Sequence, residues 1–148
     1  MTHPLVLDTN IVLDALVFRD PRTHALHHAV FGDAARSDVL WLATAPMREE
    51  LARVLAYPHI AARLAFHGLQ AGQVLSQFDA RVRIVPVASK APATCKDPDD
   101  QKFIDLAVSH GASLLSKDKA VLCMRRRLMK LGVVEVGSLW QPTHAADK

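Results

Sequence analysis

The chain has 148 residues, of which half are apolar and 22% are charged, and its net charge at pH 7 is +3. This length and composition exclude wholesale disorder and favour one compact domain that folds without disulfides. The mild excess of basic residues permits binding to nucleic acid without demonstrating it. We expect residues 1–140 to form a single domain and residues 141–148 a flexible tail.

The cysteines and the N-terminus bear on location. Cys95 and Cys123 lie far apart and form no CxxC pair, so we expect reduced thiols. The first ten residues, MTHPLVLDTN, have neither the basic region nor the long apolar region of a signal peptide. No uncharged run approaches the roughly 20 residues that a membrane span needs. These features predict a cytoplasmic protein without a membrane partner.

Apolar runs alternate with helical patterns along the chain. The run at 5–7 predicts a buried strand that ends at Asp8, and residues 11–18 continue as a helix with Thr9 or Asn10 available as its cap. Further helices are expected over residues 22–35, 46–55, 59–66, 70–80, 99–110 and 119–130. Further strands are expected over residues 39–43, 82–87, 113–116 and 133–134. This alternation predicts an α/β fold whose mostly parallel sheet is covered on both faces.

Acidic residues follow the predicted strands in four separate stretches. Asp8 and Asp118 each come after a strand, and Glu50 lies on the helix after the second strand. Asp97, Asp99 and Asp100 lie where a loop enters a helix. Because ligands gather at the carboxyl ends of parallel strands, these acids can meet at one edge of the sheet. Their mutual repulsion is relieved by a hard divalent cation, so the pattern indicates a Mg²⁺ or Mn²⁺ site.

Each acid also has a simpler interpretation. An Asp at a strand end often only caps the following helix, which applies to Asp8 and Asp118. Asp97, Asp99 and Asp100 can complement the dipole of their helix, and Glu50 can lie on a solvated helix face. Independent caps have no reason to converge on one edge, so the two interpretations differ in the geometry that they predict.

Four blocks together resemble a known family. The blocks LVLDTNIVLDAL, REELARVL, DPDDQKFIDLA and LLSKDKAVL have the order and spacing of a PIN-domain nuclease along residues 5–136. The DPDDQKF block is most similar to the subgroup assigned to the toxins of toxin–antitoxin pairs, relatives of the VapC-type ribonucleases. The fourth block departs from the family, which commonly has Thr before the basic residue and an aromatic residue after the Asp. Ser116 keeps the hydroxyl at that position.

The resemblance implies a three-layer α/β/α sandwich and an endoribonuclease that depends on Mg²⁺ or Mn²⁺ to hydrolyse RNA. It implies that four acids bind the metal and carry out catalysis: Asp8, Glu50, Asp100 and Asp118. Asp97, which lies in the DPDDQKF block with Asp100, assists in binding the metal. It also implies supporting roles near these acids for Thr9, Asn10, Ser116 and Asp105. Asn10 orients Asp8 or touches a phosphate, Ser116 supports Asp118, and the role of Asp105 stays open.

The partners follow from the same resemblance and from the basic residues. We expect an RNA substrate, an antitoxin protein and a homodimer. Contacts with the RNA backbone are assigned to Lys117, Lys119, Arg125 and Arg126, although a solvated basic helix is the simpler interpretation of these residues. The helical stretch from residue 60 to 78 has enough apolar side chains to hold a partner, or else packs into the core.

Two other functions compete with the nuclease. A PIN-like domain that binds RNA or protein without cutting fits the same sequence. A receiver-like phosphoacceptor domain also combines a doubly wound sheet, clustered Asp residues and Mg²⁺. That reading requires an Asp directly after the middle strand, where residues 41–45 (WLATA) provide none.

Overall fold

The computed structural model describes residues 2–32 and 38–141. The strands are β1 (His3–Leu7), β2 (Val39–Ala43), β3 (Arg83–Ile84), β4 (Ser113–Leu115) and β5 (Val136–Gly137). The α-helices are α1 (Thr9–Leu13), α2 (His24–Val30), α3 (Ala45–Leu55), α4 (Pro58–Phe66), α5 (Ala71–Arg81), α6 (Gln101–His110), α7 (Lys119–Leu122) and α8 (Arg125–Lys130). A π-helical turn (Asp14–Phe18) continues α1, and 3₁₀ turns (Pro21–Thr23 and Pro98–Asp100) precede α2 and α6.

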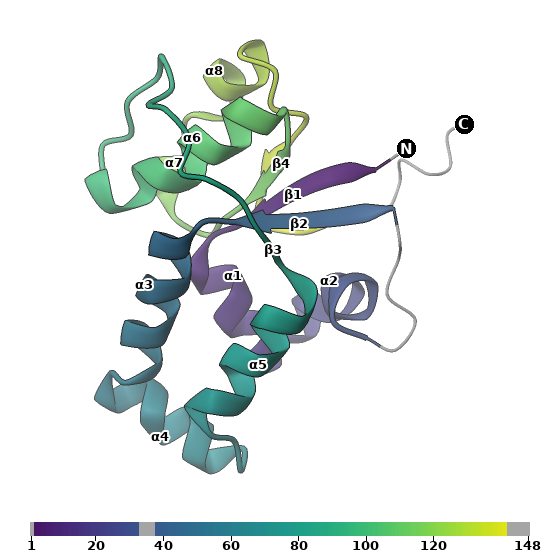
Figure 1. Ribbon diagram of the computed structural model, residues 1–148, viewed down its shortest axis with the longest axis vertical. Coiled ribbons are helices and arrows are strands. Elements are labelled where there is room, and N and C mark those ends of the chain that lie inside the picture. Colours follow the sequence, from purple (N-terminus) through teal and green to yellow (C-terminus); the bar gives the residue numbers. More distant parts are fainter. Residues whose placement is uncertain (1, 33–37, 142–148) are drawn as a thin grey trace.

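The five strands form one parallel sheet in the order β3-β2-β1-β4-β5 (Figure 1). Leu5 of β1 is in register with Trp41 of β2 on one side and with Ser113 of β4 on the other. The chain therefore builds outward from β1 to β3 and then crosses back to add β4 and β5 on the opposite side. This reversal is a topological switch point, the place where open α/β sheets form ligand sites. The expected α/β fold with a parallel sheet is confirmed.

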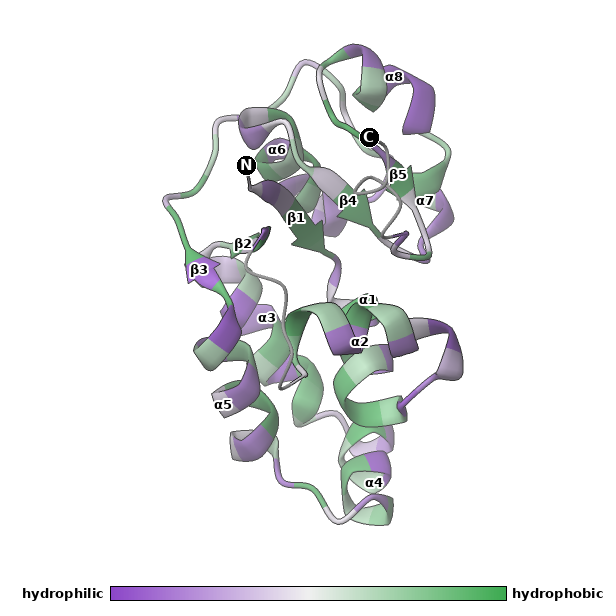
Figure 2. Cartoon of the chain, turned by 90° about the vertical axis from the view of Figure 1, so that its right-hand side faces the viewer, coloured by the Kyte–Doolittle hydropathy of each residue, from purple (hydrophilic) through white to green (hydrophobic). Residues whose placement is uncertain are grey.

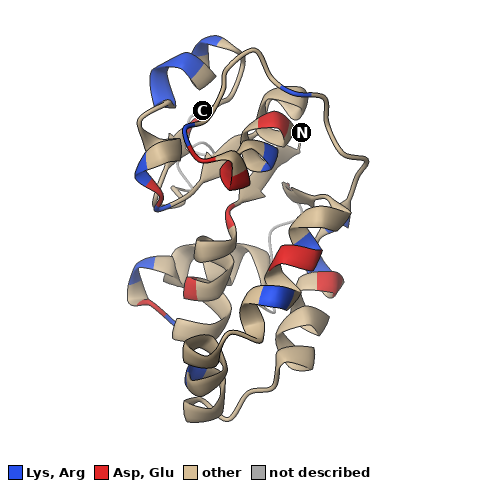
Figure 3. Cartoon of the chain, turned by 90° about the vertical axis from the view of Figure 1, so that its left-hand side faces the viewer, with Lys and Arg blue, Asp and Glu red and all other residues tan. Residues whose placement is uncertain are grey.

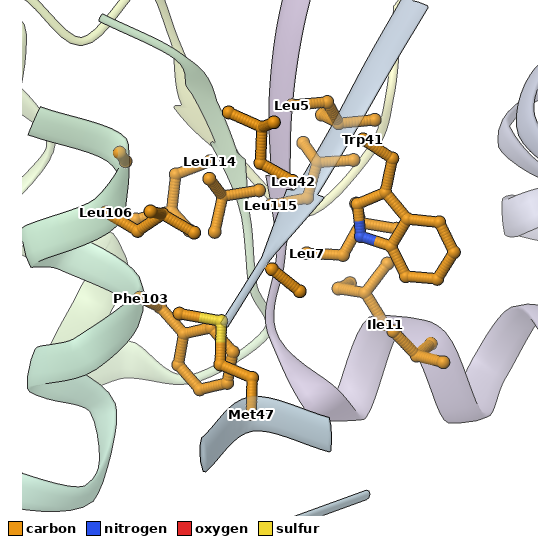
Figure 4. Packing of buried hydrophobic residues seen from close by; sticks show 14 of the residues in the cluster. Leu5, Leu7, Ile11, Trp41, Leu42, Met47, Phe103, Leu106, Leu114 and Leu115 are labelled. Atoms are coloured by element: carbon orange, nitrogen blue, oxygen red, sulfur yellow. The ribbon is translucent and has the colours of Figure 1, made fainter. Parts of the chain in front are cut away.

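Helices cover both faces of this sheet. Hydrophobic residues dominate the central strands, whereas α8 carries a long hydrophilic stretch (Figure 2). Phe103 and Leu106 of α6 lie on one side of the strands, and Ile11 of α1 lies on the other beside Trp41 (Figure 4). Residues 5–7 of β1 are buried one after another, as expected for a strand covered on both faces. No helix within the described ranges is long and apolar enough to cross a membrane.

Two predicted strands differ from the observed ones for reasons of backbone hydrogen bonding. The strand expected over 82–87 is limited to β3, because its partner β2 ends at Ala43, where the chain turns into α3, and the N–H of Val85 makes the last bond to the carbonyl of Ala43. The strand expected at 133–134 lies instead at Val136–Gly137. The N–H of Val133 is used to close α8 on the carbonyl of Leu128.

Two predicted helices also differ. The helix expected over 119–130 is divided into α7 and α8, since the N–H of Met124 bonds to the carbonyl of Val121 in the tighter i→i−3 pattern. The helix expected over 22–35 ends at Val30, and its last expected residues, 33–35, lie outside the described residues. Of the expected tail, residues 142–148 also lie outside them.

Candidate metal centre

The carboxyl ends of β1 and β4 bring two distant acids together. The N–H of Asp8, directly after β1, donates to the carbonyl of Leu115 at 2.9 Å, so the chain leaving β1 runs beside the end of β4. Asp118 follows β4 by three residues. The turn that carries Asp97 and Asp100 precedes α6, which packs against both strands. Acidic residues accordingly occur near the middle of the chain's cartoon (Figure 3).

Asp97, Asp100 and Asp118 form the tightest acidic group. One carboxylate oxygen from each lies within 4.8 Å of the other two, and among the described residues this is the one such group of three metal-ligating side chains. Asp100 is buried, with 7% of its surface exposed. The negative charge of Asp8, itself 4% exposed, acts on Asp100 and raises the pKa of that carboxyl group. Four of the five predicted ligands are thus brought to one place.

Two of these acids are helix caps as well. Oδ1 of Asp97 accepts the N–H of Asp99, and Oδ1 of Asp118 accepts the N–H of Ala120, each at 2.9 Å. A carboxylate has about four lone-pair positions, so one cap bond leaves it able to bind a cation. The cap interpretation is therefore correct for Asp118 and compatible with a metal site, whereas the side chain of Asp8 makes no cap bond to α1. The cap made by Asp97 is an additional finding.

Burial and crowding alter the protonation of the group. Burial, the hydrogen bond with Asp118 and the charge of Asp8 raise the pKa of Asp100 to about 8. The same hydrogen bond lowers the pKa of Asp118, and burial raises the pKa of Asp8. Adjacent carboxylates behave in this way when one proton is shared between them. In the absence of metal, Asp100 therefore carries a proton at neutral pH.

The group fits a hard divalent cation. The Oδ2 atom of Asp100 is buried without a hydrogen-bond partner in the described structure, which is costly for a polar atom. The donors offered by Asp97, Asp100 and Asp118 are all carboxylate oxygens. Mg²⁺ and Mn²⁺ prefer such ligands, and a cation held by these residues would take the place of the shared proton and would satisfy the orphaned oxygen.

A single hydroxyl group links the two strand ends. Ser116 is completely buried, and its Oγ donates to Oδ2 of Asp8 at 2.6 Å. The same oxygen accepts the N–H of Asp118 at 3.0 Å. The expected support of Asp118 by Ser116 is thus visible as a backbone contact, and the bond to Asp8 is an additional one.

Glu50 approaches the centre from α3 but is engaged by other partners. Its Oε2 accepts the hydroxyl of Thr9 at 2.5 Å, and its Oε1 lies 2.5 Å from Nζ of Lys102. Its charge is near enough to raise the pKa of Asp8. Glu50 therefore ties α1, α3 and α6 together at the edge of the acidic group.

A family model described as PIN domain matches residues 4–120. The chain belongs to the PIN-domain family. No curated protein matches the sequence. The matched region contains every predicted acid of the site, from Asp8 to Asp118. Membership in this family, whose members are typically metal-dependent nucleases, argues against the receiver-like alternative.

The remaining supporting residues of this PIN domain position backbone segments. Oδ1 of Asn10 accepts the N–H of Lys117 at 3.3 Å, which holds the segment that follows β4. Oδ1 of Asp105 accepts the N–H of Ala91 at 2.9 Å and the side-chain amide of Gln101 at 2.8 Å. Asp105 thereby fastens the loop that leads to the acidic turn onto α6, which gives it the structural role that sequence reasoning left open.

The basic residues assigned to RNA divide into two kinds in this PIN domain. Nζ of Lys117 is 2.7 Å from Oδ2 of Asp14, and Arg125 pairs with Glu135 through Nε at 2.8 Å. Lys119 and Arg126 are exposed on α7 and α8. Lys117 and Lys119 directly flank Asp118 in the sequence.

Sequence reasoning missed two residues of this PIN domain. Asp14 is 4% exposed and paired with Lys117; an isolated acid in the apolar run IVLDALV was a usable signal of a buried ion pair. Lys102 lies within the DPDDQKF block, but only the fold places its amine against Glu50.

Proposed function

We propose that this protein is an endoribonuclease that depends on Mg²⁺ or Mn²⁺ and hydrolyses RNA as the toxin of a bacterial toxin–antitoxin pair. The observation that carries the proposal is the meeting of Asp97, Asp100 and Asp118 within 4.8 Å, with Asp8 beside them. Family membership supports the nuclease chemistry.

Each acid has a definite task in this proposal. Asp8, Asp97, Asp100 and Asp118 hold the cation, while Glu50 borders the site. A bound Mg²⁺ or Mn²⁺ lowers the pKa of water and neutralises charge on the phosphate under attack. Ser116 keeps the Asp8 carboxylate in one orientation, so the ligand oxygens are placed before the cation arrives. Asp100 would give up its proton on binding a cation, because its raised pKa leaves it protonated without one.

The deciding experiment is cleavage of a mixed set of labelled RNAs by the purified protein with Mn²⁺, with Mg²⁺ or with EDTA. We expect cleavage with either metal and none with EDTA. The variant Asp8→Asn should fold and lose activity, whereas Asp79→Asn, whose side chain pairs with Arg48 on the surface, should keep it. Binding of RNA without cleavage under any metal would instead support the non-catalytic PIN-like domain.

The toxin role requires partners, and the proposal includes an antitoxin protein and a homodimer. Most large apolar side chains of the 60–78 stretch belong to the core, since Ile60, Leu64, Val74 and Phe78 are buried. Phe66 of α4 is the exception, with 79% of its surface exposed.

Expression of the wild-type chain should slow bacterial growth, and expression of Asp8→Asn should not. Equal growth would remove the toxin role and leave the ribonuclease proposal intact. Light scattering should report a dimer, and a monomeric mass at every concentration would overturn that part.

A further inference from the structure

We infer that Lys102 is a substrate-contacting residue, placed at the acidic centre to bind a phosphate oxygen of the RNA backbone. The inference rests on the proposed function. Lys102 is the second residue of α6 and follows Asp100 by two positions. Its side chain therefore starts from the first turn of α6, directly after the 3₁₀ turn that supplies two of the acids.

The ammonium group of Lys102 is held in one position. Nζ lies 2.5 Å from Oε1 of Glu50 and 2.5 Å from the backbone oxygen of Asp99, and it lies 5.0 Å from the centre of the Phe103 ring. Surface lysines usually lose affinity because their long side chains must be ordered on binding. Here folding has already ordered the side chain, so a ligand meets a fixed cation.

The same group keeps a donor for a ligand. A lysine ammonium has three N–H bonds, and the two oxygen contacts use two of them. The Lys102 side chain is 25% exposed and that of Glu50 is 18% exposed, so the pair lies at the rim of the site and solvent reaches it. The third N–H can therefore donate to an oxygen that arrives from outside.

Three other paired cations have partners that lie outside the predicted site, unlike Lys102. Arg48, Lys117 and Arg125 pair with Asp79, Asp14 and Glu135. None of those three acids belongs to the predicted site. Lys102 differs from these cations because its acid, Glu50, borders the group formed by the metal-ligating aspartates.

Electrostatics explain why a fixed cation is needed there. An RNA backbone that approaches the clustered aspartates is repelled by their negative charge, and a metal ion would compensate only at the position that it occupies. A lysine acts on phosphate as a point charge, which suits a contact beside the metal. Glu50 then acts as a positioning residue: it holds Lys102 through Oε1 and is itself held by Thr9 through Oε2.

The test compares Lys102→Met, which keeps the apolar stem, with Lys102→Arg, which keeps the charge. The probe is a labelled single-stranded RNA that the wild-type protein cuts. We expect Lys102→Met to raise KM about tenfold or more, the cost of one charge-assisted contact, with a smaller change in kcat. The slope of log KM against log salt should become shallower by about 0.7. Lys102→Arg should recover most of the slope.

Lys130→Met on α8 is the control, since Lys130 is a helical lysine that is exposed and lies outside the acidic group. It should leave KM near the wild-type value. Mn²⁺ affinity, measured by electron paramagnetic resonance without RNA, should stay unchanged or tighten in Lys102→Met because a positive charge has left. An unchanged KM and salt slope would overturn the inference, as would weaker Mn²⁺ binding accompanied by a loss of kcat alone. If the wild-type protein neither binds nor cuts RNA, the proposed function itself fails and the inference with it.

Discussion

The hydroxyl group of Ser116 donates a 2.6 Å hydrogen bond to the carboxylate of Asp8 across a sequence separation of 108 residues. The two residues follow β1 and β4, which are neighbours in the sheet. Because the same oxygen accepts the N–H of Asp118, one side chain orients one acid and the backbone of another. The geometry of the acidic centre therefore depends on a residue that carries no charge.

Ser116→Ala should reduce both activity and stability. The buried carboxylate of Asp8 and the N–H of Asp118 each lose a partner, so we expect a loss of about 1–3 kcal/mol in the free energy of unfolding. RNA cleavage should fall at least tenfold because Asp8 is no longer held. Urea denaturation and single-turnover cleavage measure the two effects. Ser113→Ala, at the start of β4, should change neither greatly. Wild-type cleavage by Ser116→Ala would refute the role of the hydroxyl.

The stability of the metal-free protein should fall as the pH rises from about 4 to about 8. The pKa of Asp100 is raised from 3.8 to about 8, so within this window the folded chain holds a proton that the unfolded chain releases. Stability falls with pH wherever the folded state binds more protons. The lowered pKa of Asp118 makes stability rise with pH instead, but this rise is complete once the pH exceeds 3.8, the pKa of the unfolded chain.

Thermal denaturation in EDTA between pH 5 and 8.5 checks this pH dependence. Asp100→Asn should flatten the profile, because its amide does not titrate. Asp99→Asn is the matched control from the same turn, with an exposed side chain, and should keep the wild-type slope. Parallel profiles for wild type and Asp100→Asn would show that Asp100 is not the titrating group.

Divalent cations should stabilise the protein more strongly at pH 8 than at pH 6. A cation must displace the proton of Asp100, and that displacement is easier near or above its pKa. The rise in melting temperature with Mn²⁺ measures the effect. Asp97→Asn and Asp118→Asn should each reduce the rise, since both side chains belong to the ligand group. A rise that neither substitution affects would place the cation elsewhere.

Asp105→Ala should loosen the loop that carries the approach to Asp97. The substitution removes the acceptor of Ala91 N–H and of the Gln101 side chain, which we expect to cost about 1–3 kcal/mol. Hydrogen exchange should accelerate at the Ala91 amide, while amides in the centre of β1 stay protected. Asp105→Asn keeps one acceptor oxygen and should be milder. Unchanged exchange at Ala91 would contradict the proposed fastening.

Lys117→Met should destabilise the protein even though Lys117 lies on the surface. It leaves Asp14, which is 4% exposed, without its cation at 2.7 Å. Since the Lys117 side chain is 41% exposed, solvent lowers the cost to about 1–2 kcal/mol. Asp14→Asn should remove most of the penalty in the double variant. Additive losses in this cycle would mean that the two residues do not interact, and an effect on RNA affinity alone would favour the role as an RNA contact.

Much of the fold was predictable because burial and hydrogen bonding act locally. The run Leu5–Leu7 is apolar at successive positions, which suits a strand covered on both faces. The ends of strands and the breaks in helices were harder to predict from the sequence. β3 stops where its partner β2 ends at Ala43, and the spacing of apolar residues does not reveal this. The N–H of Val133 closes α8 on the carbonyl of Leu128, so β5 begins later than the apolar run predicts.

The acids of the site were predictable as a set, because Asp residues after strands repeat in the order of the PIN domain. The sequence by itself determined the alternation of strands and helices, the family, and the oxygen-rich chemistry of the centre. Only the tertiary structure decided that β4 lies beside β1, which brings Ser116 to Asp8 and groups Asp118 with Asp100. It also placed Lys102 against Glu50. Strand order and side-chain pairing depend on packing between distant segments, and no local pattern of residues encodes them.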